Sequence, residues 1–440
     1  MGITYASLDY NNYYSYRNPN ASVAKYGTLN KIEYPTRGFT EFIFEPHYYR
    51  KQLKLKRWEG VDELTSNQLA GGLRIKQIKN CPTPSGPAQL VKEYFYVSDY
   101  IQNPASPVKS SGVLGGQVQY YFTDYTVYAF NDRDVRRKMS MFSSISVLPS
   151  CHNTLGSHIG YTEVIEKNAD NSFTRHQFSN FDNGYLDEKA IEVIQESRTP
   201  YEPYGSKAME RGLLLLKEDY NLSLKKIRSK AIIYEKDDHY QRVVNMLKAR
   251  YRNVCPGTAV SYDEGAFWQI WTYLMLPKTE TETFYDPLNG SALQSIITNY
   301  TNIGYTFDVG LYPIPPTNLV KNIKTTDSEG RTSQADFRYC YNYSGVAVTD
   351  PVIRDMQRLG MQPLLEKKVT KNGTPIIETN VYGRIGDVFY PKQTKIKNGD
   401  RDERILISHE VSDIYGNPVY TLEKGEIKKV TIWGYVRVNL

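Results

Sequence analysis

The feature that most constrains this chain is a short turn between two strand-like runs that recurs along the sequence. Near the C-terminus it lies in SDIYGNPVY, residues 412–420, and at least three further segments of the same design precede it. Hairpins repeated in series stack into one extended body, because each copy shields the apolar face of its neighbour. The sequence therefore says more about what is built than about which reaction, if any, the chain carries out.

Composition supports β-structure. The chain of 440 residues has 38 tyrosines against 15 phenylalanines and 4 tryptophans. Tyrosine suits a pleated, half-buried surface, where its ring packs across strands and its hydroxyl stays in water. With 40% hydrophobic and 23% charged residues, a packed core is feasible. We predict an all-β fold of serial antiparallel hairpins, forming an extended twisted sheet or a partial β-shell, with a few short helices.

Strand-like runs on either side of turn residues define the expected hairpins. The first spans residues 29–45, where proline early in the turn 35–38 and glycine at its end suit a type I geometry. A second joins the runs 160–167 and 172–178. From about residue 211 the units become more uniform, and the expected pairs are 213–220 with 224–235, 276–286 with the strand after Gly290, 318–326 with 331–341, 364–370 with 374–381, and 405–412 with the strand beyond residue 417.

Helices are expected to be few. The best candidate is residues 350–360, with Asp350 as N-cap, Pro351 at the first helical position and a glycine at the end. Residues 187–197 are a second candidate. Residues 240–250 have helical propensity but strand-like neighbours, so both states stay open there.

Domain boundaries are less marked than the hairpins. Residues 104–116 are rich in Pro, Ser and Gly and predict a long surface loop. The first 200 residues are less regular than the rest, so we expect a β-rich region over 1–200 and a hairpin array over 201–440. One continuous body is the alternative.

Charge excludes one large class of partner. The net charge is +6 with a pI near 8.7, which is mild for this length. Acidic residues break or border the basic runs at 54–57 and 133–138, and Lys54 and Lys56 are interpreted as the solvated face of a strand. We therefore expect no nucleic-acid partner.

Membrane and targeting signals are not recognised in the sequence. No run approaches 18 apolar residues, so no membrane-spanning segment is expected. The first ten residues lack a basic segment followed by an apolar stretch, so no signal peptide is predicted. Ala6 stands where the myristoylation motif requires Ser or Thr.

The four cysteines are Cys81, Cys151, Cys255 and Cys340, and no two have CxxC spacing. A chain of this size does not need disulfides, so mostly free, buried thiols are expected.

Combinations of residues that could carry chemistry have simpler explanations. Cys151, His152 and Asn153 are the residue types of a cysteine protease, but a triad needs separate elements that converge in space, so a loop is expected. His152 and His158 flank one loop and are a candidate pair for sharing a metal, although a role in the loop itself is the simpler interpretation. The six histidines show no HxxxH or HExxH spacing.

Acidic residues give no assignable pair either, because the separation that glycoside hydrolysis needs is spatial. Asp182 and Asp124 are interpreted as turn or edge residues. We assign no catalytic, cofactor-binding or metal-binding residue and expect no cofactor.

Several segments together resemble one known group. They are YPTRGFTEF at 34–42 followed by EPH at 45–47, GGLRI at 71–75, GYTEV at 160–164, DIYGNP at 413–418 and WGY at 433–435. In this order they resemble landmarks of the RHS/YD-repeat-like large secreted proteins of Gram-negative bacteria, over nearly the whole chain. The tyrosine–aspartate repeat itself is degenerate, for example DSEGR at 327–331 without the tyrosine.

The resemblance implies a cell-surface or extracellular protein of the bacterial envelope. Members of the group usually carry a signal peptide and several hundred residues upstream, and they continue past the WGY landmark. The chain is therefore expected to be an internal or truncated portion of such a protein.

Three functions follow as hypotheses. The first is a structural or interaction protein, a β scaffold without catalysis of its own, whose partners are other segments of a larger polypeptide. The second is a glycan-binding module that stacks exposed tyrosines, such as those in NNYYSY at 11–16, on surface sugars. The third is a hydrolase of unknown substrate.

Overall fold

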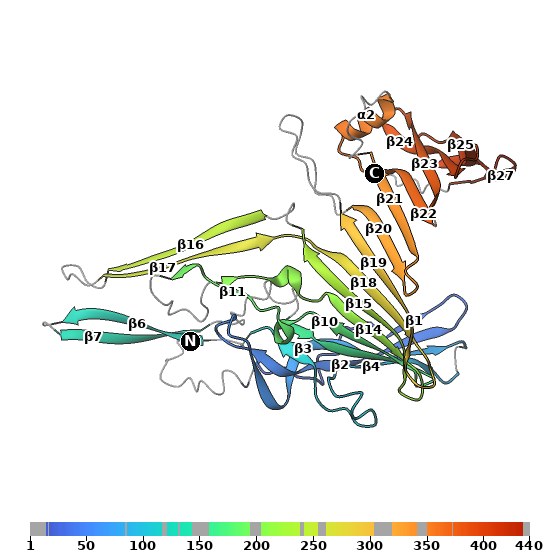
Figure 1. Cartoon of the computed structure of the whole chain (residues 1–440). Coiled ribbons are helices and arrows are strands. Elements are labelled where there is room, and N and C mark those ends of the chain that lie inside the picture. The colour runs from blue at the N-terminus through green and yellow to red at the C-terminus, as the bar shows by residue number, and fades with distance from the viewer. Residues whose placement is uncertain are drawn as a thin grey trace. The chain divides into compact units, whose positions relative to one another are not determined.

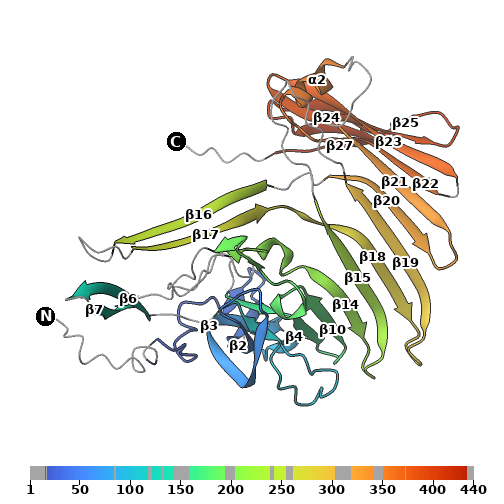
Figure 2. The same cartoon turned by 60° about the vertical axis from the view of Figure 1, so that its left-hand side comes forward.

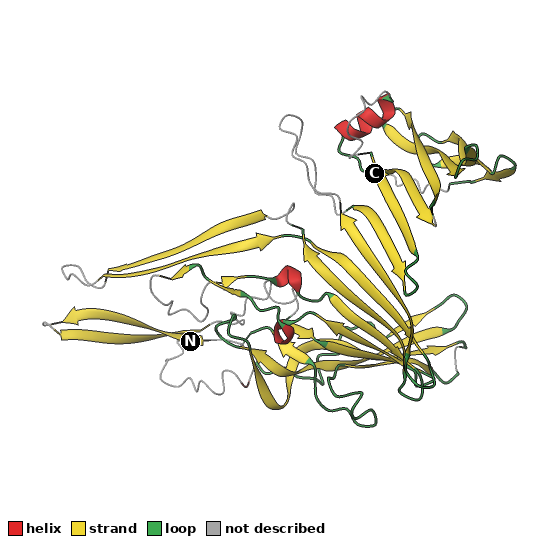
Figure 3. Cartoon of the chain, viewed as in Figure 1, coloured by secondary structure: helices red, strands yellow, loops and turns green. Residues whose placement is uncertain are grey.

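Strands dominate the chain, and the predicted all-β class is confirmed (Figure 3). Twenty strands belong to one mostly antiparallel hydrogen-bonded sheet. The computed structural model describes residues 15, 17–83, 86–116, 121–130, 133–142, 158–193, 204–237, 242–253, 261–302, 319–340, 350–371 and 373–433.

The chain divides into two compact units. Unit 1 comprises Met1–Ile232, Lys236–Met275 and Thr283–Leu293, and unit 2 comprises Ile233–Glu235, Leu276–Glu282 and Gln294–Leu440. The expected division at residue 200 stays a prediction. Strands β10 (Phe173–Phe178) and β14 (Leu214–Tyr220), which lie on either side of that point, pair within unit 1.

One five-residue turn closes hairpins throughout the chain. At its C-terminal copy the N–H of Asp413 donates to the carbonyl oxygen of Asn417 at 2.9 Å, and the N–H of Gly416 donates to that of Asp413 at 3.0 Å. This is a type I turn followed by a residue of positive φ. The same two bonds close the turns that begin at Tyr34, Asn168, Asn221 and Asp327. The positive-φ residues, in chain order, are Arg37 (68°), Asn171 (68°), Leu224 (59°), Gly330 (77°) and Gly416 (83°).

The first hairpin has the predicted type I turn, and its residue of positive φ is Arg37. Gly38 has another role, because a Cβ there would lie 2.9 Å from the carbonyl oxygen of Cys81. The turn that follows β1 (Lys31–Glu33) packs closely against the backbone at Cys81, and this close approach requires a glycine.

Unit 2 contains a meander in chain order (Figures 1 and 2). Each strand pairs antiparallel with the next, as the predicted serial hairpins require. The strands are β20 (Val320–Asp327), β21 (Thr332–Tyr339), β22 (Leu364–Lys371), β23 (Thr374–Ile385), β24 (Val388–Asn398), β25 (Arg404–Ser412), β26 (Pro418–Glu423) and β27 (Ile427–Val430). Two more of the predicted runs are strands β18 (Met275–Tyr285) and β19 (Ala292–Asn302).

The best helix candidate is confirmed as α2 (Pro351–Arg358). The Asp350 side chain accepts a hydrogen bond from the Val352 N–H at 2.8 Å, which is the expected N-cap. Its buried face places Met356 against Cys340 and Leu365. This small cluster is the buried core of unit 2 within the described residues.

Unit 1 orders its strands differently. Long strands β2 (Phe39–Leu53) and β3 (Val61–Cys81) pair along almost their whole length. Neighbours in the sheet then come from distant parts of the chain. The spatial order is β1, β2, β3, β4 (Gln89–Phe95), β9 (Glu163–Asn168), β10, β14 and β15 (Lys226–Lys236).

The predicted loop at 104–116 is wrong at its C-terminal end. Strand β5 (Gly112–Leu114) is completely buried, pairs parallel with β2 and antiparallel with β8 (Ile159–Tyr161). A Cβ on Gly112 would lie 2.4 Å from the carbonyl oxygen of Tyr48. The glycine therefore permits close packing of the β5 and β2 backbones. Composition alone indicates a loop for this segment.

Residues 187–197 do not begin a helix, which corrects the second helix candidate. Short strands β11 (Glu188–Lys189) and β12 (Glu192–Val193) occupy the described part of this segment, and residues 194–197 lie outside it. They pair with β13 (Tyr204–Gly205) and β17 (Ser261–Thr272). Pairing with distant partners overrides the local helical propensity.

The open question at 240–250 is resolved as a strand from residue 242 onward. Strand β16 (Arg242–Asn253) pairs with β17 in a long hairpin, and β6 (Tyr121–Phe130) pairs with β7 (Arg133–Phe142) in another. Single-turn 3-10 helices η3 (Phe181–Asn183) and η4 (Ala208–Glu210) complete the elements. In the described portion, no helix is long and apolar enough to cross a membrane.

The cysteine prediction is confirmed where it can be followed. Cys81 and Cys340 are free and buried. Cys151 and Cys255 lie outside the described residues.

Candidate functional site

A β-bulge in unit 1 sets the orientation of His47. The register of β2 against β3 shifts between Pro46, paired with Leu73, and His47, paired with Ala70. The extra residues on β3 are the two glycines of the GGLRI segment, and Gly72 has a φ of 89°. A Cβ on Gly72 would lie 3.1 Å from the imidazole Cδ2 of His47. The bulge therefore makes room for this ring, as bulges beside functional side chains often do.

A chain of hydrogen bonds connects His47 to Arg74, whose side chain is 10% exposed. The Tyr161 hydroxyl lies 2.8 Å from His47 Nδ1 and accepts a hydrogen bond from Arg74 Nη1 at 2.8 Å. Arg74 also pairs with Glu45, its Nε donating to Oε1 at 2.8 Å. Because arginine can only donate, the Tyr161 oxygen accepts from Arg74, and the same hydroxyl forms the hydrogen bond to His47 Nδ1.

Aromatic rings surround the guanidinium of Arg74. Its central carbon lies 4.3 Å from the ring centroid of Tyr96, 5.1 Å from that of Tyr161 and 5.6 Å from that of Tyr48. Each distance is within the range of cation–π attraction. The Tyr96 hydroxyl donates to the carbonyl oxygen of Ile75 at 2.8 Å. The arginine is thus held on its faces by rings and at its edge by a carboxylate.

The protonation states of this cluster do not favour acid–base work near neutral pH. Burial, together with the neighbouring His158 and Arg74, lowers the pKa of His47 to about 4. Burial raises the pKa of Tyr161 to about 12, although Arg74 opposes the shift. A general acid or base works best with a pKa near the operating pH. Both groups are therefore neutral hydrogen-bonding partners at pH 7.

The histidine pair considered for a metal, His152 with His158, lies partly outside the described residues. His152 is not among them, and His158 Nε2 is 2.8 Å from the carbonyl oxygen of Gly71. The His158 ring makes an edge-on contact with His47, with centroids 5.9 Å apart. Among the residues for which side chains are described, no group of three His, Cys, Asp or Glu is arranged to hold a metal ion.

Asp182 lies in the turn predicted for it. It is part of η3, which the Asn180 side chain caps. Its carboxylate accepts from Lys51 Nζ at 2.7 Å and from the Thr162 hydroxyl at 2.5 Å. The side chain of Asp124 and residues Cys151–Asn153 lie outside the described part of the chain.

A buried ion cluster forms a second polar centre of unit 1. Arg57 Nε lies 2.7 Å from Asp187 Oδ2, and Arg211 Nη1 lies 2.9 Å from Asp187 Oδ1. All three side chains are at most 2% exposed. Burial lowers the pKa of Arg211, although Asp187 opposes the shift. A cation–π contact places Arg211 4.1 Å from the ring centroid of Phe181.

This cluster corrects the interpretation of residues 54–57. They follow the end of β2 and form a loop, so Lys54 and Lys56 do not line one face of a strand. Arg57, the last residue of the run, is 1% exposed and pairs with an acid 130 residues away in the chain. Its environment is decided by long-range pairing, which the order of residues in the sequence does not reveal.

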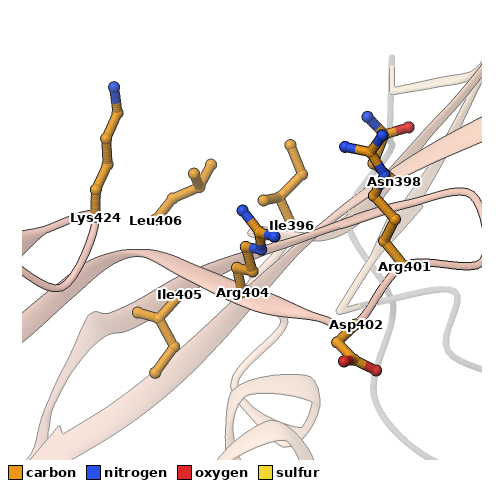
Figure 4. Close-up of a pocket in the computed structure, with 8 residues that line it drawn as sticks. All are labelled: Ile396, Asn398, Arg401, Asp402, Arg404, Ile405, Leu406 and Lys424. Carbon is orange, nitrogen blue, oxygen red and sulfur yellow. The ribbon is translucent and has the colours of Figure 1, made fainter.

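Unit 2 contains a hollow of about 330 Å3 near one end of β24 and β25 (Figure 4). Arg401, Arg404 and Lys424 line it together with apolar Ile396 and Leu406. The remaining lining residues are Asn398, Asp402 and Ile405. Nothing in the sequence had pointed to it, because its cations come from two separate turns and the start of a strand.

The tyrosines proposed for glycan stacking at 13, 14 and 16 lie outside the described residues. Some of the described tyrosines are buried in the core. One is Tyr220, whose ring stacks on Phe173 with centroids 4.6 Å apart. Tyr415 at the tip of the last turn is exposed.

Comparison with known proteins gives weak likenesses. No family model matches the chain. No curated protein matches it. Among solved structures it is similar to a TcdB2-TccC3-TEV crystal structure, with a TM-score of 0.11 and 7% identity over 89% of this chain and 22% of that one. It is also similar to the Photorhabdus luminescens Tc holotoxin pore, with a TM-score of 0.13 and 8% identity over 87% of this chain and 16% of that one.

The chain thus spans 22% and 16% of the length of these two structures. At such TM-scores the likeness carries no weight for fold or function.

Proposed function

We propose that the chain is a structural and interaction protein of the bacterial cell envelope, an RHS/YD-repeat-like β scaffold without catalysis of its own. Its partners are other segments of a larger polypeptide. The observation that carries the proposal is the meander of unit 2, in which each strand pairs with the next in chain order. Such a body is assembled from repeated hairpins and offers long exposed faces and loop tips for contact.

The polar clusters of unit 1 support the same role. Arg74 is paired with Glu45 and enclosed by tyrosine rings, and Asp187 is shared by two buried arginines. Satisfied networks of this kind stiffen a core and specify one packing arrangement. These pairings account for the charged residues of the two clusters without assigning them a catalytic role.

Cell fractionation and protease shaving test the envelope role. We expect an antibody against this chain to detect it in the envelope fraction, and expect protease added to intact cells to remove the signal. A cytoplasmic enzyme detected in the same samples is the control for lysis. Recovery of the chain only from the soluble cytoplasm would contradict the proposed location.

A separate assay tests the absence of catalysis. The purified chain is incubated with ester, peptide and glycoside substrates, in parallel with the variant His47→Gln. We expect no turnover above that of buffer. Turnover that follows the purified chain and disappears in the variant would replace the scaffold with an enzyme.

A further inference from the structure

We propose that the hollow of unit 2 binds a small organic phosphate, with the phosphate held by Arg401, Arg404 and Lys424 and the apolar part resting on Ile396 and Leu406. This site is independent of the scaffold role, because it concerns a small ligand and one end of one sheet.

The backbone brings the three cations to one place. Arg401 belongs to the turn after β24, where its N–H donates to the carbonyl oxygen of Asn398 at 3.2 Å. Arg404 begins β25 and lies directly opposite Ile396 in the register. The N–H of Lys424 donates to the carbonyl oxygen of Leu406 at 2.7 Å, which holds the β26–β27 turn against β25.

A bulge sets the floor of the hollow. The register of β24 against β25 pairs Thr394 with Ile407 and Lys395 with Ile405, so Leu406 is the extra residue. Figure 4 shows Leu406 and Ile396 on the same side of the ribbon as the three cations, while Ile405 projects to the other side. Side chains alternate along a strand, so Arg404 and Leu406 lie on one face of β25 with or without the bulge. The extra residue changes where Leu406 lies along β24.

The cations lack acidic partners in this arrangement. Arg401, Arg404 and Lys424 form no ion pair with any residue that the structure describes. Two nearby acids are engaged elsewhere, Glu403 with Lys395 at 3.0 Å and Glu423 with Lys429. Asp402 projects away from the three cations (Figure 4). Three like charges around one hollow repel one another, and a bound anion would relieve that repulsion.

Lys424 has an unusual backbone conformation that supports a binding role. Its φ is 50°, and with Gly425 at 75° it forms the two central residues of a turn closed by the N–H of Glu426 on the carbonyl of Glu423 at 3.1 Å. Hairpin turns of this kind favour Asn or Gly at the first central position. A lysine held there is an outlier of the kind that often occurs at ligand sites.

Size and charge define the class of ligand. Sites for small molecules are concave, about 300–1,000 Å3 in volume, and combine apolar walls with a few polar groups. The hollow of about 330 Å3 is at the small end of that range. A phosphate monoester carries about −1.5 to −2 charges at pH 7 and offers three acceptor oxygens. It can therefore engage more than one of these cations, and guanidinium groups suit its geometry.

Three probes separate the contributions of charge and apolar contact. Phenyl phosphate joins a phosphate dianion to an apolar ring, inorganic phosphate has only the charge, and benzyl alcohol has only the ring. In NMR titrations of the whole chain we expect phenyl phosphate to bind more tightly than inorganic phosphate, and benzyl alcohol to cause no saturable shift. Phenyl phosphate that binds no better than either of the other two would overturn the proposal.

A matched pair of variants tests the location. Lys424→Gln and Lys397→Gln each remove one lysine charge, but Lys397 is exposed on β24 and does not line the hollow. We expect Lys424→Gln and Arg404→Gln each to weaken phenyl phosphate binding about tenfold or more. Lys397→Gln is expected to weaken it by less than about twofold, because successive residues of a strand point to opposite faces and Lys397 lies between the lining residues Ile396 and Asn398.

Circular dichroism of each variant checks that the sheet is retained. Equal weakening by Lys424→Gln and Lys397→Gln would show that overall charge attracts the phosphate, and it would overturn the assigned site. Unchanged binding in both Lys424→Gln and Arg404→Gln would overturn it as well.

Discussion

Unit 1 and unit 2 are built from the same kind of hairpin but assemble it in different ways. In unit 2 strands β20 to β27 pair in chain order, whereas in unit 1 β4 pairs with β9 and β10 pairs with β14. Contacts between distant segments close larger loops and require more specific pairing. The comparison indicates that the serial order of unit 2 requires only hairpins between consecutive strands, while the order in unit 1 also depends on long-range contacts.

The two units also differ in how they treat charge. In unit 1 the Arg57–Asp187–Arg211 cluster is at most 2% exposed, whereas the least exposed member of any ion pair between described residues of unit 2 is Asp327, at 18%. Buried charges must be paired, but exposed charges need not be. In unit 1, buried ion pairs therefore help to hold distant segments of the chain together. In unit 2, the ion pairs between described residues are more exposed and do not have this role.

The largest expected effect is at Asp187. Asp187→Asn leaves two buried guanidinium groups without their carboxylate and should lower the free energy of unfolding of unit 1 by about 3–5 kcal/mol. The control is Asp387→Asn in unit 2, where the aspartate is fully exposed and pairs with Arg384 at 2.9 Å. We expect less than about 0.5 kcal/mol there. Hydrogen exchange and denaturant titration measure the loss of stability for both variants. Similar losses at the two sites would contradict the difference between the buried ion pairs of unit 1 and the exposed ones of unit 2.

The next effect concerns the buried strand β5 of unit 1. Gly112→Ala places a Cβ 2.4 Å from the Tyr48 carbonyl oxygen and should destabilise unit 1 by about 1–3 kcal/mol. Gly71→Ala is the matched control, because its added Cβ meets no atom within 4 Å. We expect this change to be neutral or slightly stabilising. If thermal unfolding shows the same midpoint for both variants, the close packing of β5 on β2 is not what stabilises this region.

A smaller effect follows from the titration of His47. Its pKa is 6.5 in the unfolded chain and about 4 in the folded one, so between these pH values the unfolded state binds more protons. The contribution of neutral His47 to the free energy of unfolding is therefore fully present above pH 6.5 and is lost as the pH falls toward 4. Since the ring is only partly buried, we expect a loss on the order of 1 kcal/mol. His47→Gln should flatten this part of the curve of unfolding free energy against pH, and an unchanged curve would contradict the prediction.

The smallest effect compares one position of the repeated turn in both units. Leu224 of unit 1 and Gly330 of unit 2 have φ values of 59° and 77° at equivalent places. Leu224→Gly should stabilise its hairpin by about 1 kcal/mol, because glycine adopts positive φ without a steric cost. Gly330→Ala should destabilise its hairpin by a similar amount, although a Cβ there meets no atom within 4 Å. Shifts of the same sign in thermal unfolding would show that the two turns are not equivalent.

Much of the fold was predictable from the sequence. Alternating runs around turn residues located the hairpins at 160–178 and 405–423 and the cap of α2, because these depend on local chemistry. Buried strand β5 was not predictable, since Gly112 packs against the carbonyl oxygen of Tyr48 on the distant strand β2. The residues of positive φ were partly hidden too, because Arg37 and Leu224 occupy a conformation that glycine usually signals.

The candidate sites were less predictable than the fold. His47 and Tyr161 belong to two segments quoted for the family resemblance, but their contact joins residues 114 apart in the chain. The cations of the hollow come from the β24–β25 and β26–β27 turns and the first position of β25, and no spacing rule links them. Where pairing is local the sequence is enough, and where it is distant only the folded chain reveals the neighbours.

The repeated turn has a consequence for how freely its residues can be exchanged. Two main-chain hydrogen bonds close it, and across YPTRG, NADNS, NLSLK, DSEGR and DIYGN no position keeps one residue type. The turn thus depends on main-chain geometry and tolerates different side chains at each of its five positions. A grafted tip should therefore give the surface a new contact without rebuilding the strands that carry it.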